Sequence, residues 1–198
     1  MFFKNDFSNR ELNYLEVNRR DLKDSSFEKS DLSNSDLNNS DFRNSNFRES
    51  KMHESKVWLS NFSSADFNSA NLQDVAWINS NFQNANFSGA NLEKASLDDS
   101  NLNNAIMTNA ILTGISLYHT SIYRTDFRGA RIGNSAIKTV LQVGPTGPFN
   151  ETLLIWIMEN KTILYSLCNQ IQVPEERLDR VEKYPAAIFS FAKEIANN

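Results

Sequence analysis

The sequence predicts an all-β solenoid with four-sided coils, and three observations support this prediction. Large apolar residues recur every five positions from Phe2 to Ile137 without a break. A small residue stands two positions before most of them, and the phenylalanines among them fall at spacings of twenty. A helix repeats its buried face about every 3.6 residues and a strand about every 2, so a period of five fits neither element on its own.

The period of five holds over 28 successive positions in a chain of 40% hydrophobic residues. An unbroken run of that length has a chance probability on the order of 10⁻¹¹. The residue two positions earlier is Ser, Ala or Thr from Ser25 to Ser135, except at Val75 and Ile115. One large and one small residue in every five indicate that both point inward. We therefore expect a chain that turns a corner at every fifth residue.

The phenylalanines indicate how many corners close one coil. Ten of the 28 large apolar residues are Phe, and they form two series with a spacing of twenty. Twenty residues are four pentapeptides, so each coil has four sides and the rings stack along two adjacent faces. At a sheet spacing of about 4.8 Å, about seven coils form a rod roughly 30 Å long. The two series are Phe2, Phe42, Phe62 and Phe82, and Phe7, Phe27, Phe47, Phe67, Phe87 and Phe127.

The repeat itself has a characteristic pattern, Ala-Asp/Asn-Leu/Phe-x-x. It is seen in ADFNS at residues 65–69, ANLQD at 70–74 and ANFSG at 85–89. Over about residues 2–140 the chain resembles the pentapeptide-repeat family, and the resemblance implies a right-handed quadrilateral β-helix. It implies little about function, because one scaffold can serve several functions.

The pattern changes after Val140, which divides the chain into two predicted domains. Residues 1–140 form the β-helix, and residues 141–198 form a C-terminal module. The Gly/Pro segment 144–148 is typical of a hinge, and apolar runs on both sides of residues 159–161 predict a β-hairpin.

Two helices are expected after this hairpin, because Pro174 and Pro185 are each followed by helix-forming residues. The C-terminal module is therefore predicted to be a small α+β unit. It should cover the unpaired last strands of the β-helix, which would otherwise promote aggregation.

The composition excludes several classes of protein. A net charge of −4 lacks the basic excess of a nucleic-acid binder, so we expect no direct contact with nucleic acid. The single cysteine, Cys168, cannot form a disulfide within the chain, which is typical of a reducing compartment. No signal peptide and no run of about 20 apolar residues is present. We expect a cytoplasmic protein with no membrane attachment.

Signals for catalysis are weak, and we predict no enzyme activity, no metal and no cofactor. His53 and His119 should lie on different faces more than three coils apart, so they cannot share a metal. The recurring Asp and Asn residues suit turns better than paired-carboxylate catalysis. GPTG at residues 144–147 lacks the Lys that follows in a phosphate-binding loop, and Cys168 stands in an apolar strand.

The outward positions carry the clearest functional signal, on the side that we call the fourth face. Its large inward residues run from Val17 to Ile137 in steps of twenty, and its outward positions on successive coils include apolar and aromatic residues. A contiguous apolar surface of this kind is seldom left bare. Either the C-terminal module or a second copy of the chain covers it, or it binds another protein. The candidate interaction residues are Trp58, Leu59, Ile78, Tyr118 and His119.

Two functions follow from these observations. The favoured one is a non-catalytic scaffold that binds a protein partner whose identity the sequence does not give, with a homodimer as one alternative. The family resemblance implies the second: some relatives protect bacterial DNA gyrase or topoisomerase IV by imitating duplex DNA, and those relatives are dimers with strongly acidic faces. Residues 1–140 hold 17 acidic and 15 basic residues, a net charge of only −2, which argues against such imitation.

Overall fold

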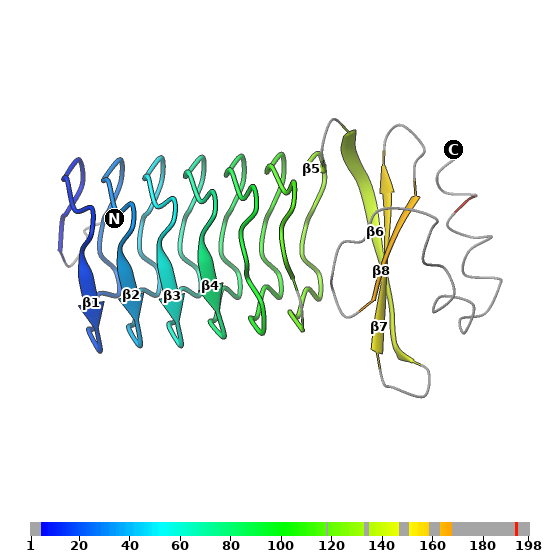
Figure 1. The fold of residues 1–198 in the computed structure, drawn as a ribbon, viewed down its shortest axis with the longest axis horizontal. Helices are drawn as coiled ribbons and strands as arrows, with labels where there is room; N and C mark the ends of the chain where they lie inside the picture. Colours follow the sequence, from blue (N-terminus) through cyan, green and yellow to red (C-terminus); the bar gives the residue numbers. More distant parts are fainter. Residues whose placement is uncertain are drawn as a thin grey trace.

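The fold is a rod of stacked coils followed by an antiparallel sheet (Figure 1). A computed structural model describes residues 5–117, 119–132, 135–146, 151–158, 163–167 and 193. The strands are β1 (Glu16–Asn18), β2 (Asp36–Asn38), β3 (Lys56–Trp58), β4 (Ala76–Ile78), β5 (Arg131–Ile132), β6 (Ser135–Thr146), β7 (Glu151–Met158) and β8 (Ile163–Leu167). Figure 1 shows β1 to β4 in line along one side of the rod, which is the fourth face.

Parallel bridges between residues twenty positions apart join the coils. One column of bridges runs from Asp6 to Asp126 and passes through seven coils. The same register pairs β1 with β2 and β3 with β4, for example Val57 with Trp77. The structure therefore confirms the quadrilateral β-helix of about seven coils that the sequence predicts.

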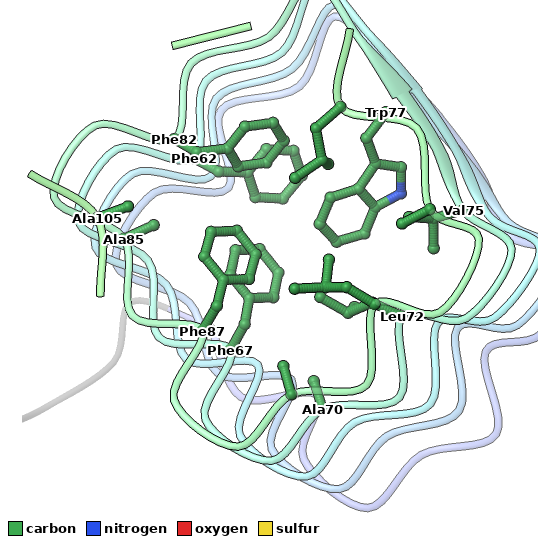
Figure 2. Close-up of a cluster of buried hydrophobic side chains, with 14 of the residues drawn as sticks. Phe62, Phe67, Ala70, Leu72, Val75, Trp77, Phe82, Ala85, Phe87 and Ala105 are labelled. Carbon is green, nitrogen blue, oxygen red and sulfur yellow. The ribbon is translucent and has the colours of Figure 1, made fainter. Parts of the chain in front are cut away.

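Stacked phenylalanine rings fill one side of the core. In one column the ring centroids of Phe47 and Phe67 are 5.0 Å apart, and those of Phe67 and Phe87 are 4.9 Å apart. In the adjacent column the centroids of Phe62 and Phe82 are 5.5 Å apart, and Figure 2 shows the two columns side by side. The predicted stacking of rings along two adjacent faces is confirmed.

Trp77 extends this aromatic core toward the fourth face. Its ring is stacked 5.7 Å from that of Phe62 and 5.5 Å from that of Phe82, and the side chain is fully buried. The indole Nε1–H donates to the Ser55 hydroxyl at 2.9 Å. This hydrogen bond satisfies the one polar group that the buried indole brings inside.

The corners of the coils share one backbone conformation. The residue two positions after each large apolar residue has a positive φ at all 25 corners between residues 9 and 129, and 22 of these residues are not glycine. At a typical corner the Ala70 N–H donates to the Phe67 carbonyl at 3.0 Å, and the Asn68 N–H donates to Asp66 Oδ1 at 3.0 Å. The recurring Asp and Asn side chains thus act as turn acceptors, as the sequence indicates.

The corner that follows the fourth face is built differently, from a ladder of serine hydroxyls. The Ser40 N–H donates to Ser60 Oγ at 3.0 Å. The N–H groups of Ser60 and Ser80 donate in the same way to the hydroxyls of Ser80 and Ser100, each at 3.1 Å. Each hydroxyl also donates to a carbonyl, as Ser60 does to Leu37 at 2.8 Å. A side chain of the next coil therefore satisfies a buried backbone N–H at this corner.

At the end of the rod the chain reverses onto its own last strand. Ala136 in β6 pairs antiparallel with Arg131 in β5, so the repeat backbone ends at Ile132 although the apolar period in the sequence continues to Ile137. Pairing with β6 covers the edge that the last parallel strand would leave open. The predicted domain boundary after residue 140 falls inside β6.

The apolar runs predicted to form a hairpin are β7 and β8, which pair antiparallel from Leu153 with Leu167 to Ile157 with Ile163. β7 also pairs antiparallel with β6. These three strands lie beyond β5 at the end of the rod (Figure 1). Of the helices predicted after Pro174 and Pro185, only Lys193 is described, and it is helical; the other residues of both segments lie outside the described residues.

The phenylalanine columns predict unequal effects of two truncations. Phe67→Ala should destabilise the fold by about 3–5 kcal/mol, because this buried ring is stacked between Phe47 and Phe87. Phe127→Ala should cost less, because Met107 precedes it in its column. Urea melts of the two variants measure the difference, and equal losses would count against stacking in columns of twenty.

The serine ladder predicts a second pair of unequal effects. Ser60→Ala should cost about 1–3 kcal/mol, because it leaves the Ser40 N–H in the buried corner without its acceptor. Ser50→Ala is the matched control in the same coil, since the Phe47 carbonyl that accepts from the Ser50 hydroxyl also accepts from the Ser50 N–H. This control should cost less than about 1 kcal/mol. Equal shifts of the two urea midpoints would contradict a specific role for the ladder.

Candidate functional site

An apolar patch lies on the fourth face, where β3 and β4 run side by side. Trp58 is paired in register with Ile78, and these side chains are 55% and 36% exposed, while Val57 and Trp77 point into the core. Leu59 follows at the corner, with φ 54° and 49% exposure. At a sheet spacing of about 4.8 Å the three exposed residues form one surface. We call Trp58, Leu59 and Ile78 the apolar patch.

The fourth face is extended in β1 to β4, and its local sequence departs from that of most other corners. Most other corners have an Asp or Asn before the large apolar residue, but successive coils of the fourth face have Lys56, Ala76 and Ser96 at this position. Even Asp36 accepts a hydrogen bond from the Asn38 side-chain amide. In β3 and β4 the residues on either side of the buried Val57 or Trp77 point outward. A missing Asp or Asn does not by itself mark this face, because Lys51 and Ile106 on other faces also replace it and precede turns.

Polar residues flank the apolar patch along the rod. On the N-terminal side, Asn38 Oδ1 accepts a hydrogen bond from the Trp58 N–H at 2.8 Å, which fixes the backbone of the exposed tryptophan. On the C-terminal side, Asp98 Oδ1 accepts from the Ser116 hydroxyl at 2.6 Å. The patch is thus bounded by amide groups at one end and by carboxylates at the other.

The five candidate residues do not all lie together. His119 stands two coils beyond Ile78 in the repeat, and its Nδ1 is 3.4 Å from Asp99 Oδ1. The Asp99 coil therefore separates His119 from the apolar patch. Tyr118 lies outside the described residues. The structure brings together Trp58, Leu59 and Ile78.

Two exposed isoleucines lie outside the set that the sequence predicts, as do the exposed tyrosines Tyr14 and Tyr123. Ile106 and Ile111 occupy positions where the preceding coil has Asn86 and Asn91, and they are exposed on adjacent faces of one coil. The replacement of Asn by Ile at a turn position is the signal that identifies them. They make a smaller apolar surface than the patch on the fourth face.

Two exposed arginines hold neighbouring carboxylates in the charged form. Arg43 donates to both oxygens of Asp41, with Nη2 2.6 Å from Oδ2, and these hydrogen bonds lower the pKa of Asp41. Arg128 repeats the geometry on Asp126, also with 2.6 Å from Nη2 to Oδ2, and lowers the pKa of that carboxyl. Both pairs are local turn contacts within one pentapeptide.

The described residues offer little for cofactor chemistry. Within them, no group of three or more His, Cys, Asp or Glu side chains could hold a metal ion. His53 Nδ1 lies 3.0 Å from the Ser33 hydroxyl, on a different face from His119. Among the described residues there is also no helix of the length and apolarity that a membrane span requires.

The repeats match two models of one family. The pentapeptide repeat region matches residues 34–107, and a model of eight pentapeptide repeats matches residues 95–134. The two matches together cover half of the chain. The chain belongs to the pentapeptide-repeat family. No curated protein matches this pentapeptide-repeat protein.

Solved structures of other pentapeptide-repeat proteins resemble the chain in part. HetL, involved in heterocyst differentiation regulation in the cyanobacterium Nostoc sp. strain PCC 7120, is 23% identical over 62% of this chain and 63% of its own, with a TM-score of 0.44. AT2G44920, from the Arabidopsis thaliana thylakoid lumen, is 24% identical over 50% of this chain and 65% of its own, with a TM-score of 0.37. The chain thus spans less than two thirds of the length of either protein.

QnrB1, a plasmid-mediated fluoroquinolone resistance protein, is also similar in part. A trypsin-treated variant of it is 15% identical over 66% of this chain and 78% of its own, with a TM-score of 0.32. The fold of this pentapeptide-repeat protein is established by its own register and by the family models, and its function has to be argued from its own surface.

The two arginine–carboxylate pairs predict how the free energy of unfolding changes at acid pH. Because Arg43 and Arg128 lower the pKa values of Asp41 and Asp126, the folded state binds protons less readily than the unfolded chain. Their stabilising contribution is present above the unfolded pKa of about 3.9, and it is lost as the pH falls through the lower folded values. Asp41→Asn with Asp126→Asn should therefore reduce the loss of stability between about pH 5 and pH 2.

Urea midpoints measured across this pH range test the effect. Asn keeps a side-chain oxygen as acceptor for the backbone N–H groups of Arg43 and Arg128, so the turns should persist in the variant. If the urea midpoint falls with decreasing pH as steeply in the variant as in the unmodified protein, these pairs do not contribute to the loss of stability in acid.

Proposed function

We propose that this pentapeptide-repeat protein is a non-catalytic scaffold that binds a protein partner through the apolar patch. The observation that carries the proposal is the exposure of Trp58, at 55%, beside exposed Leu59 and Ile78 on a regular sheet. Exposed aromatic residues that become buried on association supply much of the binding energy of protein interfaces. A continuous surface of three large apolar side chains therefore suits a protein partner better than a small polar ligand.

The rigidity of the patch supports this proposal. The Trp58 N–H is hydrogen-bonded to Asn38, and the Trp58 carbonyl accepts from the Asn39 N–H at 2.9 Å. Trp77, the inward neighbour of Ile78, is fully buried. A patch whose backbone is already fixed loses less conformational entropy on binding. Asn39 and Asn79 are exposed on either side and provide the polar rim that is typical of specific interfaces.

Imitation of duplex DNA toward a type II topoisomerase such as DNA gyrase is the alternative function. The surface charges favour it less, because basic partners neutralise five aspartates along the faces. The ion pairs are Lys23–Asp21, Arg43–Asp41, Arg48–Asp66, Lys51–Asp31 and Arg128–Asp126. A supercoiling assay with purified gyrase, with and without a quinolone, separates the two functions. Protection of gyrase, or inhibition of it, would favour the alternative.

The patch proposal predicts a loss of binding without a loss of stability. Trp58→Ala with Ile78→Ser should leave the melting temperature nearly unchanged, because both side chains project into solvent. It should weaken partner binding by at least about 30-fold. The partner is captured from a lysate of the host on the full-length protein, identified by mass spectrometry, purified, and titrated against both proteins.

Tyr123→Ala is the matched control, because Tyr123 is as exposed as Trp58 but lies on another face. This variant should bind the partner as the unmodified protein does. If the variant with Trp58→Ala and Ile78→Ser binds the purified partner as tightly as the unmodified protein does, the proposal is refuted. A melting temperature several degrees lower for that variant would show that residues of the chain itself cover the patch, and this too would refute it.

A further inference from the structure

We infer that charged side chains of the first coil keep the N-terminal edge of the rod from pairing with the β edge of another molecule. The first coil consists of residues 5–24, and one of its edges faces away from the rest of the rod. At the other end of the rod, pairing of β6 with β5 covers the last strand. The N-terminal edge is separate from the apolar patch, which begins two coils further along the fourth face.

The backbone of the first coil is unpaired on three of its sides. In the second coil the N–H groups of Asp31 and Asp36 donate to carbonyls of the first coil, each at 2.9 Å. The equivalent donors of the first coil are the N–H groups of Asp6, Glu11 and Glu16, and no described residue accepts a hydrogen bond from them. A row of free donors at the edge of a sheet is a template for another strand.

The apolar core is also incompletely covered at this end. Phe7, Leu12 and Leu22 are only partly buried. Phe27 and Leu32, which stand one coil beyond Phe7 and Leu12, are 2% and 0% exposed. Free backbone donors beside partly exposed apolar side chains favour association of one rod end with another β edge.

Carboxylates stand directly on this edge. Asp6, Glu11 and Glu16 carry the three free N–H groups, so each open side of the coil bears one carboxylate, and all three residues are exposed. A strand that packed against the edge would remove these carboxylates from water without giving them partners. Burying an unpaired charge costs more free energy than a backbone hydrogen bond returns, so the carboxylates oppose pairing.

Two arginines place charge of the opposite sign at the corners. Arg10 and Arg20 take the small-residue position that Ser30 and Ser40 occupy in the second coil. Both arginines are exposed, whereas both serines are buried. A guanidinium group stays charged at any pH at which the protein is folded. A basic edge that matched the carboxylates would therefore meet arginines at the corners, so the end of the rod disfavours partners of either sign.

The coil itself does not require these charges. Uncharged residues take the same positions farther along the rod, with Asn46, Asn71 and Ser96 in the columns of Asp6, Glu11 and Glu16. Substitutions can therefore be copied from the same columns. The resulting first-coil variant carries Asp6→Asn, Arg10→Ser, Glu11→Asn, Glu16→Ser and Arg20→Ser.

A matched control changes the same number of charges elsewhere. The first-coil variant loses three acidic and two basic residues, so its net charge changes from −4 to −3. The control loses the same numbers from exposed corners of later coils, where the positive φ suits asparagine. Its substitutions are Lys29→Asn, Glu49→Asn, Glu54→Asn, Asp74→Asn and Lys94→Asn.

Sedimentation velocity from about 1 to about 200 µM compares the self-association of the three proteins. The first-coil variant should associate at least about 10-fold more tightly than the unmodified protein, because its free donors are no longer surrounded by charge. The control should match the unmodified protein over the whole range. The first-coil variant should melt no earlier than the unmodified protein, since its new residues fit the same positions in other coils.

Hydrogen exchange identifies the surface through which the variant associates. In the unmodified protein the amides of Glu11 and Glu16 should exchange fast at every concentration, whereas those of Asp31 and Asp36 are protected by their hydrogen bonds. In the associated first-coil variant the amides at positions 11 and 16 should become protected.

Three results would overturn the inference. The first is protection of the Glu11 and Glu16 amides in the unmodified protein. The second is a first-coil variant that associates no more tightly than the control, and the third is association that leaves the amides at positions 11 and 16 unprotected. If the five substitutions prevent folding, Glu11→Asn with Glu16→Ser should shift association in the same direction relative to Glu54→Asn with Asp74→Asn, and equal association of these two variants would also overturn the inference.

Discussion

The structure depends on one constraint, the parallel backbone hydrogen bonds between residues twenty positions apart. Because every bridge between coils has this register, each side chain lies above the side chain of the equivalent pentapeptide. Residues of one kind that recur every twenty positions therefore lie above one another and form a column along the rod. The stacked rings around Phe67 and the hydroxyl ladder through Ser60 are two columns of this kind.

The corners decide which of these columns is available for binding. Where Asp or Asn accepts the backbone N–H, as at Asp66, the turn closes tightly and the outward residues are polar, with Asn68 partly buried and Ser69 exposed. On the fourth face the strand is extended, the Trp58 N–H donates to Asn38 of the preceding coil, and the Ser40 N–H donates to a serine hydroxyl of the next coil. Trp58 then projects from a parallel sheet whose backbone is hydrogen-bonded to the neighbouring coils. A buried polar ladder thus positions an exposed apolar anchor.

Much of the fold could be predicted from the sequence, because one large and one small buried residue per pentapeptide encode the coil directly. The reversal after Ile132 could not, since Ile137 continues the period although Ala136 pairs antiparallel with Arg131. The position of Trp58 could also be predicted. Its separation from His119 by the Asp99 coil also follows from the period of twenty. The exposed Ile106 escaped prediction because it fills a turn position rather than an outward one.

Acrylamide quenching of Trp58 fluorescence tests most directly whether the fourth face is an interface. The chain has three tryptophans, and the difference between the unmodified protein and Trp58→Phe isolates the signal of Trp58. Trp58 should be accessible to the quencher in the protein alone, because its side chain is 55% exposed, and protected when a purified partner occupies the patch. A Trp58 that is equally accessible under all these conditions, or already protected in dilute protein, would contradict the account.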